Sequence, residues 1–288
     1  MPPLLDASAC RNLLRSFLAE DIGPGDITTE TTVSATQRAR GEVIAKAPLV
    51  LAGMELFIEV FRLLDLATSA EIFSHDGEEL APGKILARVN ASARGLLTGE
   101  RVALNLLQRL SGIATLTRRY VCAIEGTGAE ILDTRKTTPG LRALEKYAVR
   151  VGGGKSHRKD LGEAVLIKEN HIRLAGGVSA ALTAAQAAKG RAAWIEIEVT
   201  NRDELRAALT HNPDVILLDN MSPALVRQAV DEVRKHAGPT KIRTEASGGI
   251  TLDNVREFAQ AGVDWISSGA LTHSAPAVDL SFEIEPLV

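Results

Sequence analysis

Five basic side chains in the middle of the sequence could bind an anionic ligand together. They are Arg135, Lys136, His157, Arg158 and Lys168. Arginine binds carboxylates through paired hydrogen bonds, and a lysine that follows an apolar strand is a fixed point charge. One isolated arginine would more often be solvated or salt-bridged, so the prediction depends on the cluster. The cluster predicts a site for a small anion.

The charge around this cluster differs from that of the whole chain. Residues 135–173 carry ten Lys and Arg against four Asp and Glu, whereas the 288-residue chain has a formal net charge of −3. A basic segment in an acidic protein indicates a local anionic ligand rather than a surface for long polyanions. Aromatic residues make up only 3% of the chain, so stacking platforms for single-stranded nucleic acid are scarce.

Two acidic residues close neighbouring apolar runs. Glu198 is the fourth residue of IEIEV, and Asp219 is the last residue of VILLD. Because buried carboxylates are costly unless paired or coordinated, we expect these two to hold Mg²⁺ or to accept hydrogen bonds from ribose hydroxyls. Glu196 lies two positions before Glu198 and faces the same way on a strand, so the pattern does not decide which of them is the functional acid. Salt bridges to neighbouring strands are the structural alternative.

Two loops of small residues near the end of the chain could bind a phosphate. They contain Ser247-Gly248-Gly249 and Ser268-Gly269. Small residues let backbone N–H groups approach phosphate oxygens, and barrel enzymes often bind phosphate after their last strands. Tight turns alone would explain one such loop, but two in succession favour a phosphate site.

These candidate residues follow short apolar runs that alternate with helices from residue 129 onward. The expected strands are 129–132, 164–167, 194–199, 215–218, 241–244 and 265–266, and the expected helices are 178–189, 202–209, 224–236 and 252–261. Repeated strand–helix units with continuous apolar strands indicate a parallel α/β sheet. Because every strand ends in polar residues, we favour an α/β barrel, whose strand ends meet at one mouth, over a doubly wound sheet.

The first part of the chain has a mixed α+β pattern. It predicts strands at 41–47 and 85–89, an amphipathic helix over 53–66 and a long helix over 98–124, in which Ser111-Gly112 favours a break. We therefore expect an N-terminal α+β domain over residues 1–112 and a catalytic barrel over 113–270.

Composition excludes several classes of protein. Cys10 and Cys122 are the only cysteines, which excludes a disulfide scaffold and a cysteine-rich zinc site. The first six residues, MPPLLD, lack the basic segment and the apolar core of a signal peptide, and no apolar stretch is long enough to span a membrane. We expect a cytoplasmic protein.

Long strings of the sequence resemble one known family, the quinolinate phosphoribosyltransferases, also called nicotinate-nucleotide pyrophosphorylases. The resemblance runs from about Glu20 to Ile284. It is carried by GERVALNLLQRLSGIAT, ILDTRKTTPGLR, EKYAVRVGGGKSHR, VLIKENHI, IEIEV, ILLDN, ASGGI and SSGALTHSAPAVDLSFEI.

The resemblance implies a fold, a reaction and a set of site residues. It implies an N-terminal sandwich domain, rejoined by residues 271–288, and an open, seven-stranded α/β barrel. The reaction implied is that of quinolinate with phosphoribosyl pyrophosphate and Mg²⁺, giving nicotinate mononucleotide, pyrophosphate and CO₂ for NAD biosynthesis. The substrate-binding residues implied are Thr134, Arg135, Lys136, His157, Arg158, Lys168, Glu198, Asp219, Ser247, Gly248, Gly249, Ser268 and Gly269.

Within this set, Lys136, Lys168, Glu198 and Asp219 are the expected catalytic residues, and the two acids are the expected Mg²⁺ ligands, directly or through water or substrate. The resemblance also implies a homodimer in which Arg101 of one subunit reaches the site of the other.

Three alternatives stay open at this stage. A family associated with molybdenum transport is similar in fold and motifs, although SHRKD and KENH favour the biosynthetic enzyme. Lys168 could instead form a Schiff base in an aldolase. The basic segment could also bind nucleic acid, in which case its affinity for DNA would depend steeply on salt.

Overall fold

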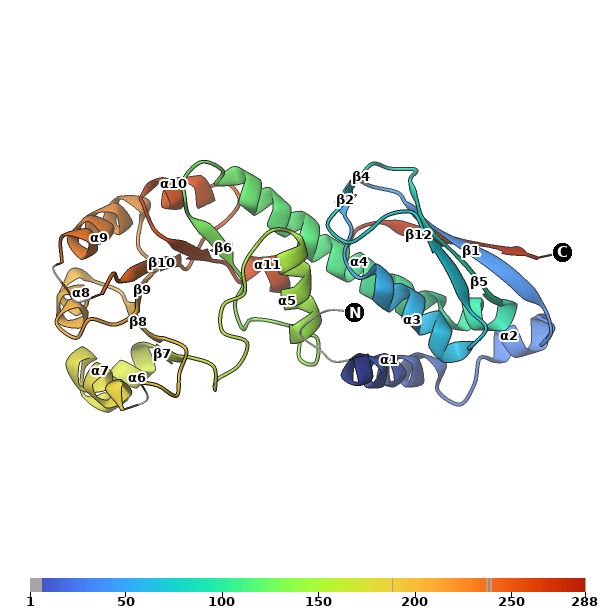
Figure 1. Ribbon diagram of the computed structural model, residues 1–288, viewed down its shortest axis with the longest axis horizontal. Coiled ribbons are helices and arrows are strands. Elements are labelled where there is room, and N and C mark those ends of the chain that lie inside the picture. Colours follow the sequence, from blue (N-terminus) through green and yellow to red (C-terminus); the bar gives the residue numbers. More distant parts are fainter. Residues whose placement is uncertain (1–6, 188, 237, 239, 288) are drawn as a thin grey trace. The chain divides into compact units, whose positions relative to one another are not determined.

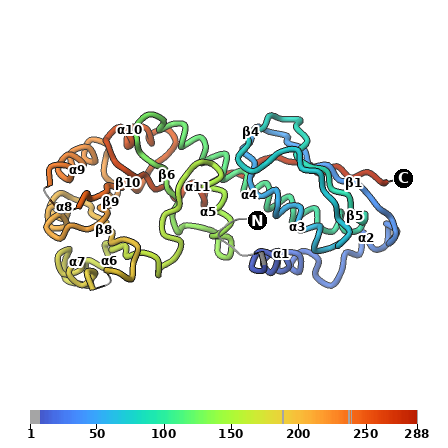
Figure 2. Tube along the Cα trace, viewed as in Figure 1, coloured from blue at the N-terminus to red at the C-terminus, as the bar shows by residue number. Residues whose placement is uncertain are grey.

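The structure is a computed structural model that describes residues 7–187, 189–236, 238 and 240–287 (Figures 1 and 2). The expectation that no signal peptide is present depends on residues 1–6, which lie outside the described residues. The chain forms two compact units. The first comprises Met1–Arg118, Ala143–Gly153 and Ser274–Val288, and the second comprises Arg119–Arg142 and Gly154–His273.

The first unit contains an antiparallel sheet of four strands in the order β12-β1-β5-β3, and a small sheet that pairs β2 with β4. Its elements are α1 (Ala7–Ile22), α2 (Ile27–Thr32), β1 (Arg38–Ala45), β2 (Leu49–Val50), α3 (Met54–Leu64), β3 (Ser69–Ile72), β4 (Glu79–Leu80), β5 (Ile85–Ser92), most of α4 (Ala93–Ala123), α5 (Arg142–Val151) and β12 (Leu280–Pro286).

Helix α3 packs its apolar face on this sheet. Phe57 and Phe61 from the helix contact Phe282 from β12, with ring centroids 5.5 and 5.3 Å from it. The ring of Phe282 lies over Gly41 of β1, where a Cβ atom would come within 2.0 Å of it. The glycine therefore makes room for the aromatic core of the unit.

Helix α4 is continuous through Ser111-Gly112, so the expectation of a break there is wrong. Gly112 lies where a Cβ atom would come within 2.0 Å of the carbonyl oxygen of Pro276. The hydroxyl of Ser111 accepts a hydrogen bond from the backbone N–H of Ala52 at 3.0 Å. The two small residues serve close packing rather than a kink.

The second unit is built on a parallel sheet of six strands in the order β6-β11-β10-β9-β8-β7. Helices follow the strands along the chain (Figure 1). Its elements are β6 (Glu130–Leu132), β7 (Val165–Ile167), α6 (Glu169–Ala175), α7 (Val178–Gln186), β8 (Ile195–Val199), α8 (Arg202–Leu209), β9 (Val215–Asp219), α9 (Pro223–Lys235), β10 (Arg243–Ser247), α10 (Val255–Gln260), β11 (Trp265–Ser267) and α11 (Ala270–His273).

Local sequence explains where two helices of the second unit begin and where one of its strands ends. Ser222 caps α9 by accepting a hydrogen bond from the N–H of Leu225, and Pro223 occupies the first turn. Asn201 caps α8 in the same way. Strand β9 is buried from Val215 to Leu218 and only its last residue, Asp219, is partly accessible. Strand β9 therefore ends where its side chains leave the core.

The described part of the sheet has six strands, and a single parallel bridge between Leu132 and Lys155 stands beside β6 in the place of a seventh. Two residues after Lys155 the chain turns toward the barrel interior, where the backbone N–H of His157 donates to the buried carboxylate of Asp133 at 2.9 Å. The sheet is an α/β barrel that stays open between this bridge and β7.

The compact units do not follow the chain in two blocks. Helix α5 packs in the first unit, although we expected all of 113–270 in the barrel. Its Glu145 is buried and paired with Arg109 at 2.9 Å, and its Tyr147 donates to Asp76 at 2.6 Å. The division of the chain into two domains at residue 112 stays a prediction.

No helix in the described part of the chain is both long and apolar enough to cross a membrane. Cys10 is buried and Cys122 is exposed.

Candidate functional site

A cavity of about 700 Å³ in the second unit is lined by the loops that follow the parallel strands. Of the residues expected at a substrate site, all except Arg101 line it. These are Thr134, Arg135, Lys136, His157, Arg158, Lys168, Glu198, Asp219, Ser247, Gly248, Gly249, Ser268 and Gly269. Because parallel strands deliver their carboxyl ends to one mouth, residues that are far apart in sequence share one wall.

One side of the cavity is strongly cationic. Arg158 is only 7% exposed, and its Nη1 donates to the carbonyl of Ala164 at 2.9 Å. Burial, followed by the nearby charge of Arg135, lowers the pKa of Arg158. The Nε of Arg135 is buried with no hydrogen-bond partner among the described residues. Two guanidinium groups held this close favour an anion between them.

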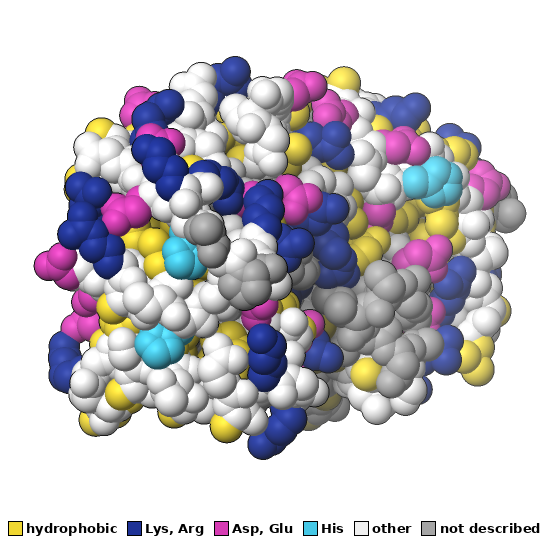
Figure 3. Space-filling model, turned by 60° about the vertical axis from the view of Figure 1, so that its left-hand side comes forward, with side chains coloured by type: hydrophobic (Ala, Val, Ile, Leu, Met, Phe, Trp, Pro, Cys, Tyr) yellow, Lys and Arg dark blue, Asp and Glu magenta, His cyan; other side chains and the backbone are white. Residues whose placement is uncertain are grey.

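Acidic side chains lie among the basic ones on the face shown in Figure 3.

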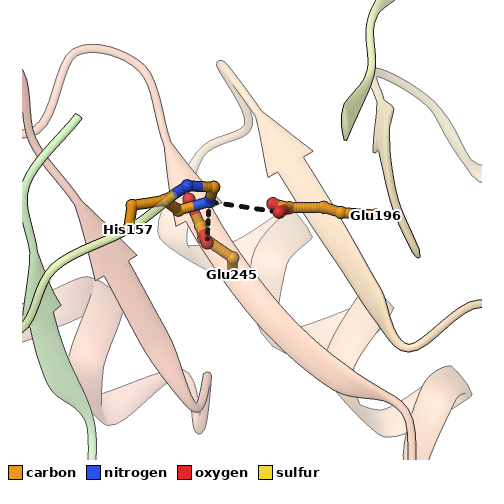
Figure 4. A group of neighbouring side chains, drawn as sticks. All are labelled: His157, Glu196 and Glu245. Carbon is orange, nitrogen blue, oxygen red and sulfur yellow. Dashed lines mark ion pairs between the residues drawn. The ribbon is translucent and has the colours of Figure 1, made fainter. Parts of the chain in front are cut away.

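The floor of the cavity holds a buried histidine between two buried glutamates (Figure 4). The Nε2 of His157 lies 3.1 Å from Glu196 Oε2 and 3.4 Å from Glu245 Oε2. Burial lowers the pKa of His157, but the two carboxylates outweigh it and raise the pKa to about 10. Burial and then the charge of Glu196 raise the pKa of Glu245. The cluster therefore retains protons that isolated side chains would release.

The orientation of the imidazole is fixed at both nitrogens. The backbone N–H of Arg158 donates to Nδ1 of His157 at 2.8 Å, so the proton of the ring belongs on Nε2, between the carboxylates. This contact opposes full protonation of the ring. The three side chains are close enough to hold a metal ion. However, a ligating Nε2 would have to give up the proton that this geometry assigns to it. We interpret the cluster as a hydrogen-bonded floor.

Glu198 and Asp219 lie on the cavity wall at the ends of adjacent strands. Glu198 Oε2 accepts from Lys168 Nζ at 2.9 Å. Burial and then the charge of Glu198 raise the pKa of Asp219, although Asn220, which donates to Asp219 Oδ2 at 2.5 Å, opposes this rise. The structure thus separates the two candidate acids of β8. Glu198 lines the cavity, whereas Glu196 points into the floor and accepts from Trp194 at 2.9 Å.

The two glycine-containing loops have different local reasons for their glycines. Gly248 has φ of +89°, and its missing side chain leaves room for the carboxamide of Asn220. At Gly269 a Cβ atom would come within 2.9 Å of Lys136 Cδ. Both glycines therefore let a neighbouring loop approach closely and also keep the backbone accessible to a ligand.

Several cavity residues were not anticipated as site residues. Glu245, Asn220, Thr251 and His273 line the cavity, together with an apolar strip to which Leu217 belongs. The pattern contained a signal for Glu245, which lies two positions before Ser247 on β10 and so faces the same side. Arg101 lies on α4 in the first unit and is exposed, so its place across a subunit interface stays a prediction.

The fold and the cavity define a class of protein, an α/β-barrel enzyme that binds phosphorylated and carboxylated ligands at the mouth of its barrel. Two domain families match the chain. The C-terminal domain of quinolinate phosphoribosyl transferase matches residues 113–283, and its N-terminal domain matches residues 26–111. The chain therefore belongs to the quinolinate phosphoribosyltransferase family.

Individual relatives agree with this assignment over nearly the full length. The chain is 43% identical to a probable nicotinate-nucleotide pyrophosphorylase [carboxylating] of Bacillus subtilis, covering 95% of this chain and 93% of that protein. It is also 43% identical to the nicotinate-nucleotide pyrophosphorylase [carboxylating] of Mycobacterium leprae, covering 96% and 97%. The crystal structure of NadC from Streptococcus pyogenes is 38% identical and superposes with a TM-score of 0.92 over 99% of both chains.

Proposed function

We propose that this protein transfers the phosphoribosyl group of phosphoribosyl pyrophosphate to quinolinate and removes one carboxylate, forming nicotinate mononucleotide, pyrophosphate and CO₂. This is the activity after which its family is named. The observation that carries the proposal is the presence of the buried Arg158 and the half-buried Arg135 on one cavity that also contains a wall of acids and two glycine loops, with the charge of Arg135 near enough to lower the pKa of Arg158 further than burial alone does.

Quinolinate is a planar dianion, and the cationic side of the cavity suits it. Arg135, Arg158 and Lys168 would bind its two carboxylates, and His157, whose two ring nitrogens already have partners, would line the pocket. The guanidinium groups can form paired hydrogen bonds with a carboxylate, while the apolar strip that includes Leu217 would contact the ring. An exposed Lys168 that is paired with Glu198 is a charged group, which fits a binding role better than that of a Schiff-base nucleophile.

Phosphoribosyl pyrophosphate would occupy the opposite wall. The backbone of the loops at 247–249 and 268–269 would bind its 5′-phosphate, and Lys136 would lie beside it. Glu198 and Asp219 fit a divalent cation, because they are two carboxylates at adjacent strand ends, where burial and then the charge of Glu198 raise the pKa of Asp219. We propose that they hold Mg²⁺, which when bound would neutralise charge on the pyrophosphate.

The chemistry needs positioning and electrostatics rather than a protein nucleophile. As the bond from ribose C1 to pyrophosphate breaks, the pyridine nitrogen of quinolinate attacks this carbon, and the pyridinium ring that results can stabilise the electron pair left when CO₂ departs. A proton from water then adds to that ring carbon. The cationic residues would hold the remaining carboxylate in place during that step. Lys136 and Lys168, both in the cavity, would face the charge that moves onto the leaving group.

We further propose a cytoplasmic homodimer in which Arg101 completes the site of the partner subunit. The exposed position of Arg101 on α4 supports a role at a surface. Two cysteines and no disulfide among the described residues are consistent with a reducing compartment. Size-exclusion chromatography with light scattering tests the dimer. An inactive Arg101→Ala protein mixed with an inactive Lys168→Ala protein would recover activity if Arg101 acts across subunits.

An end-point assay tests the activity itself. Purified protein is incubated with quinolinate, phosphoribosyl pyrophosphate and Mg²⁺, and nicotinate mononucleotide is followed by chromatography, with nicotinic acid in place of quinolinate in a parallel reaction. Product from quinolinate alone supports the proposal, and no product from either substrate refutes it.

The variant Arg158→Ala tests the cationic wall. Loss of one charged hydrogen bond is worth about 1.5–3 kcal/mol, so quinolinate affinity should fall about 10- to 150-fold. Lys155→Ala is the matched control, because Lys155 belongs to the same basic segment but its side chain is 62% exposed and pairs with Glu130. Unchanged quinolinate affinity in a folded Arg158→Ala protein would rule out this assignment.

A further inference from the structure

Asn220 occupies an unusual backbone conformation between two parts of the site. Its φ is +53°, in the left-handed region that residues other than glycine seldom adopt. It follows Asp219, the last residue of β9, and its backbone N–H donates to the carbonyl of Ser247 at 3.0 Å. The residue therefore joins the end of β9 to the glycine loop that follows β10.

The side chain of Asn220 contacts both neighbours. Its Nδ2 donates to Asp219 Oδ2 at 2.5 Å. Its Oδ1 lies 2.3 Å from the point that a Cβ atom of residue 248 would occupy, so only glycine fits there. One carboxamide thus fixes an oxygen of the acid and also sets the position of the loop.

We propose that Asn220 is a positioning residue that couples the acid Asp219 to the loop formed by Ser247, Gly248 and Gly249. This inference rests on the proposed function, in which the acid and the loop bind different parts of phosphoribosyl pyrophosphate. By holding Oδ2, the carboxamide leaves the other carboxylate oxygen of Asp219 for a cation or a ribose hydroxyl. By filling the space over Gly248, it fixes the backbone that faces the phosphate.

The same chain contains a matched arrangement away from the cavity. Asn212 also has a positive φ, of +48°, and its Oδ1 lies 2.1 Å from the Cβ position of Gly238. Its Nδ2 donates to Thr240 at 2.7 Å, and none of these three residues lines the cavity. Asn212→Gly therefore reproduces the structural cost of losing such an asparagine without touching the site.

The test compares Asn220→Gly, Asn220→Asp and Asn212→Gly with the unmodified protein. Glycine and aspartate both tolerate the left-handed conformation, so these changes remove the amide donor with little backbone strain. For Asn220→Gly we expect the KM for phosphoribosyl pyrophosphate to rise about tenfold, as for loss of one hydrogen bond to a charged group. Asn220→Asp should raise it further, because it places two carboxylates side by side. The KM for quinolinate should change less than twofold in both.

A purely structural role predicts a different result. It would lower the melting temperature of Asn220→Gly and Asn212→Gly alike and leave both KM values unchanged. A KM for phosphoribosyl pyrophosphate within twofold of the unmodified protein in both Asn220 variants would overturn the proposal, as would an equal rise in both KM values. Calorimetric titration with phosphoribosyl pyrophosphate and Mg²⁺ gives the same comparison without turnover. It therefore still decides the role of Asn220 if the unmodified protein forms no nicotinate mononucleotide, a result that would count against the proposed function alone.

A double-mutant cycle tests the coupling directly. In the unmodified protein, Gly248→Ala should weaken binding of phosphoribosyl pyrophosphate, because the new methyl group meets the Asn220 carboxamide. In the Asn220→Gly background the contact with the carboxamide is gone and only the backbone nitrogen of residue 220 stays close, at 2.9 Å, so the same change should weaken binding by a smaller factor. Equal factors in the two backgrounds would contradict the coupling.

Discussion

The substitution Glu245→Gln tests whether the floor of the cavity holds a proton at neutral pH. The Glu245 side chain is 1% exposed and lies 3.4 Å from His157 Nε2. Burial, reinforced by the charge of Glu196, raises the pKa of its carboxyl above the ordinary value of 4.5. Glutamine has the same shape as a protonated glutamate and cannot ionise. At a pH where Glu245 is protonated, the variant should be about as stable as the unmodified protein.

The pH dependence has a definite sign. Above pH 4.5 the unfolded chain releases the proton of Glu245, whereas the folded chain keeps it. The free energy of unfolding therefore falls as pH rises, by up to about 1.4 kcal/mol per pH unit, until pH passes the raised pKa of the folded state.

Urea unfolding between pH 5 and pH 8 measures this effect. The two tryptophans, Trp194 and Trp265, both lie in the second unit, so their fluorescence reports on the barrel. We expect the stability of Glu245→Gln relative to the unmodified protein to increase steadily with pH. The control is Glu130→Gln, whose original side chain is 48% exposed and should give no such trend. A stability difference for Glu245→Gln that stays constant from pH 5 to pH 8 would refute the reasoning.

Three further substitutions test other contacts. Gly269→Ala should lower kcat several-fold, because the new Cβ meets the flexible chain of Lys136 at 2.9 Å, and the ring of His273 at 3.0 Å, and displaces the charge of Lys136; unchanged kcat would contradict this. Gly41→Ala should destabilise the first unit by about 1–3 kcal/mol in urea unfolding, since the methyl group collides with the buried ring of Phe282. Burial opposes ionisation of Asp264, but hydrogen bonds from an arginine and a backbone amide lower its pKa below 3.8. Asp264→Asn should therefore cost about 1–3 kcal/mol at pH 7, and this cost should shrink as pH falls below 3.8, which acid-range melting curves can check.

The sequence predicted the barrel well because its strands carry strong local signals. Buried parallel strands are nearly continuous apolar runs, and β8 and β9 lie at or within one residue of the expected positions. β10 lies further along than the expected 241–244, at Arg243–Ser247. Its buried Thr244 and Glu245 are polar, so no apolar run marks the strand. Hydrophobic pattern alone cannot locate a strand whose inward residues serve a site.

The site was predictable at the level of which residues meet, but not how they pair. Arg158 was expected from the cluster of basic residues and Asp219 from the end of a strand, and the structure brings both to one cavity. The two glutamate partners of His157 were not expected, because they come from β8 and β10 and only the fold sets their distances from the imidazole. Helix α5 was missed for a similar reason, since its buried Glu145 is polar and is stabilised by a partner in α4. Tertiary contacts, which no local pattern records, decide such cases.

The placement of α5 in the first unit affects how this chain can be recombined with its relatives. The backbone passes from one compact unit to the other at 118/119, 142/143, 153/154 and 273/274. A chimera joined once, near residue 112, would therefore pair a foreign Asp76 with the native Tyr147 that normally donates to it. An exchange that respects the packing must carry residues 143–153 and the C-terminal strand along with the first unit. A chimera that keeps the packing of the first unit must therefore take all three of its segments from the same parent.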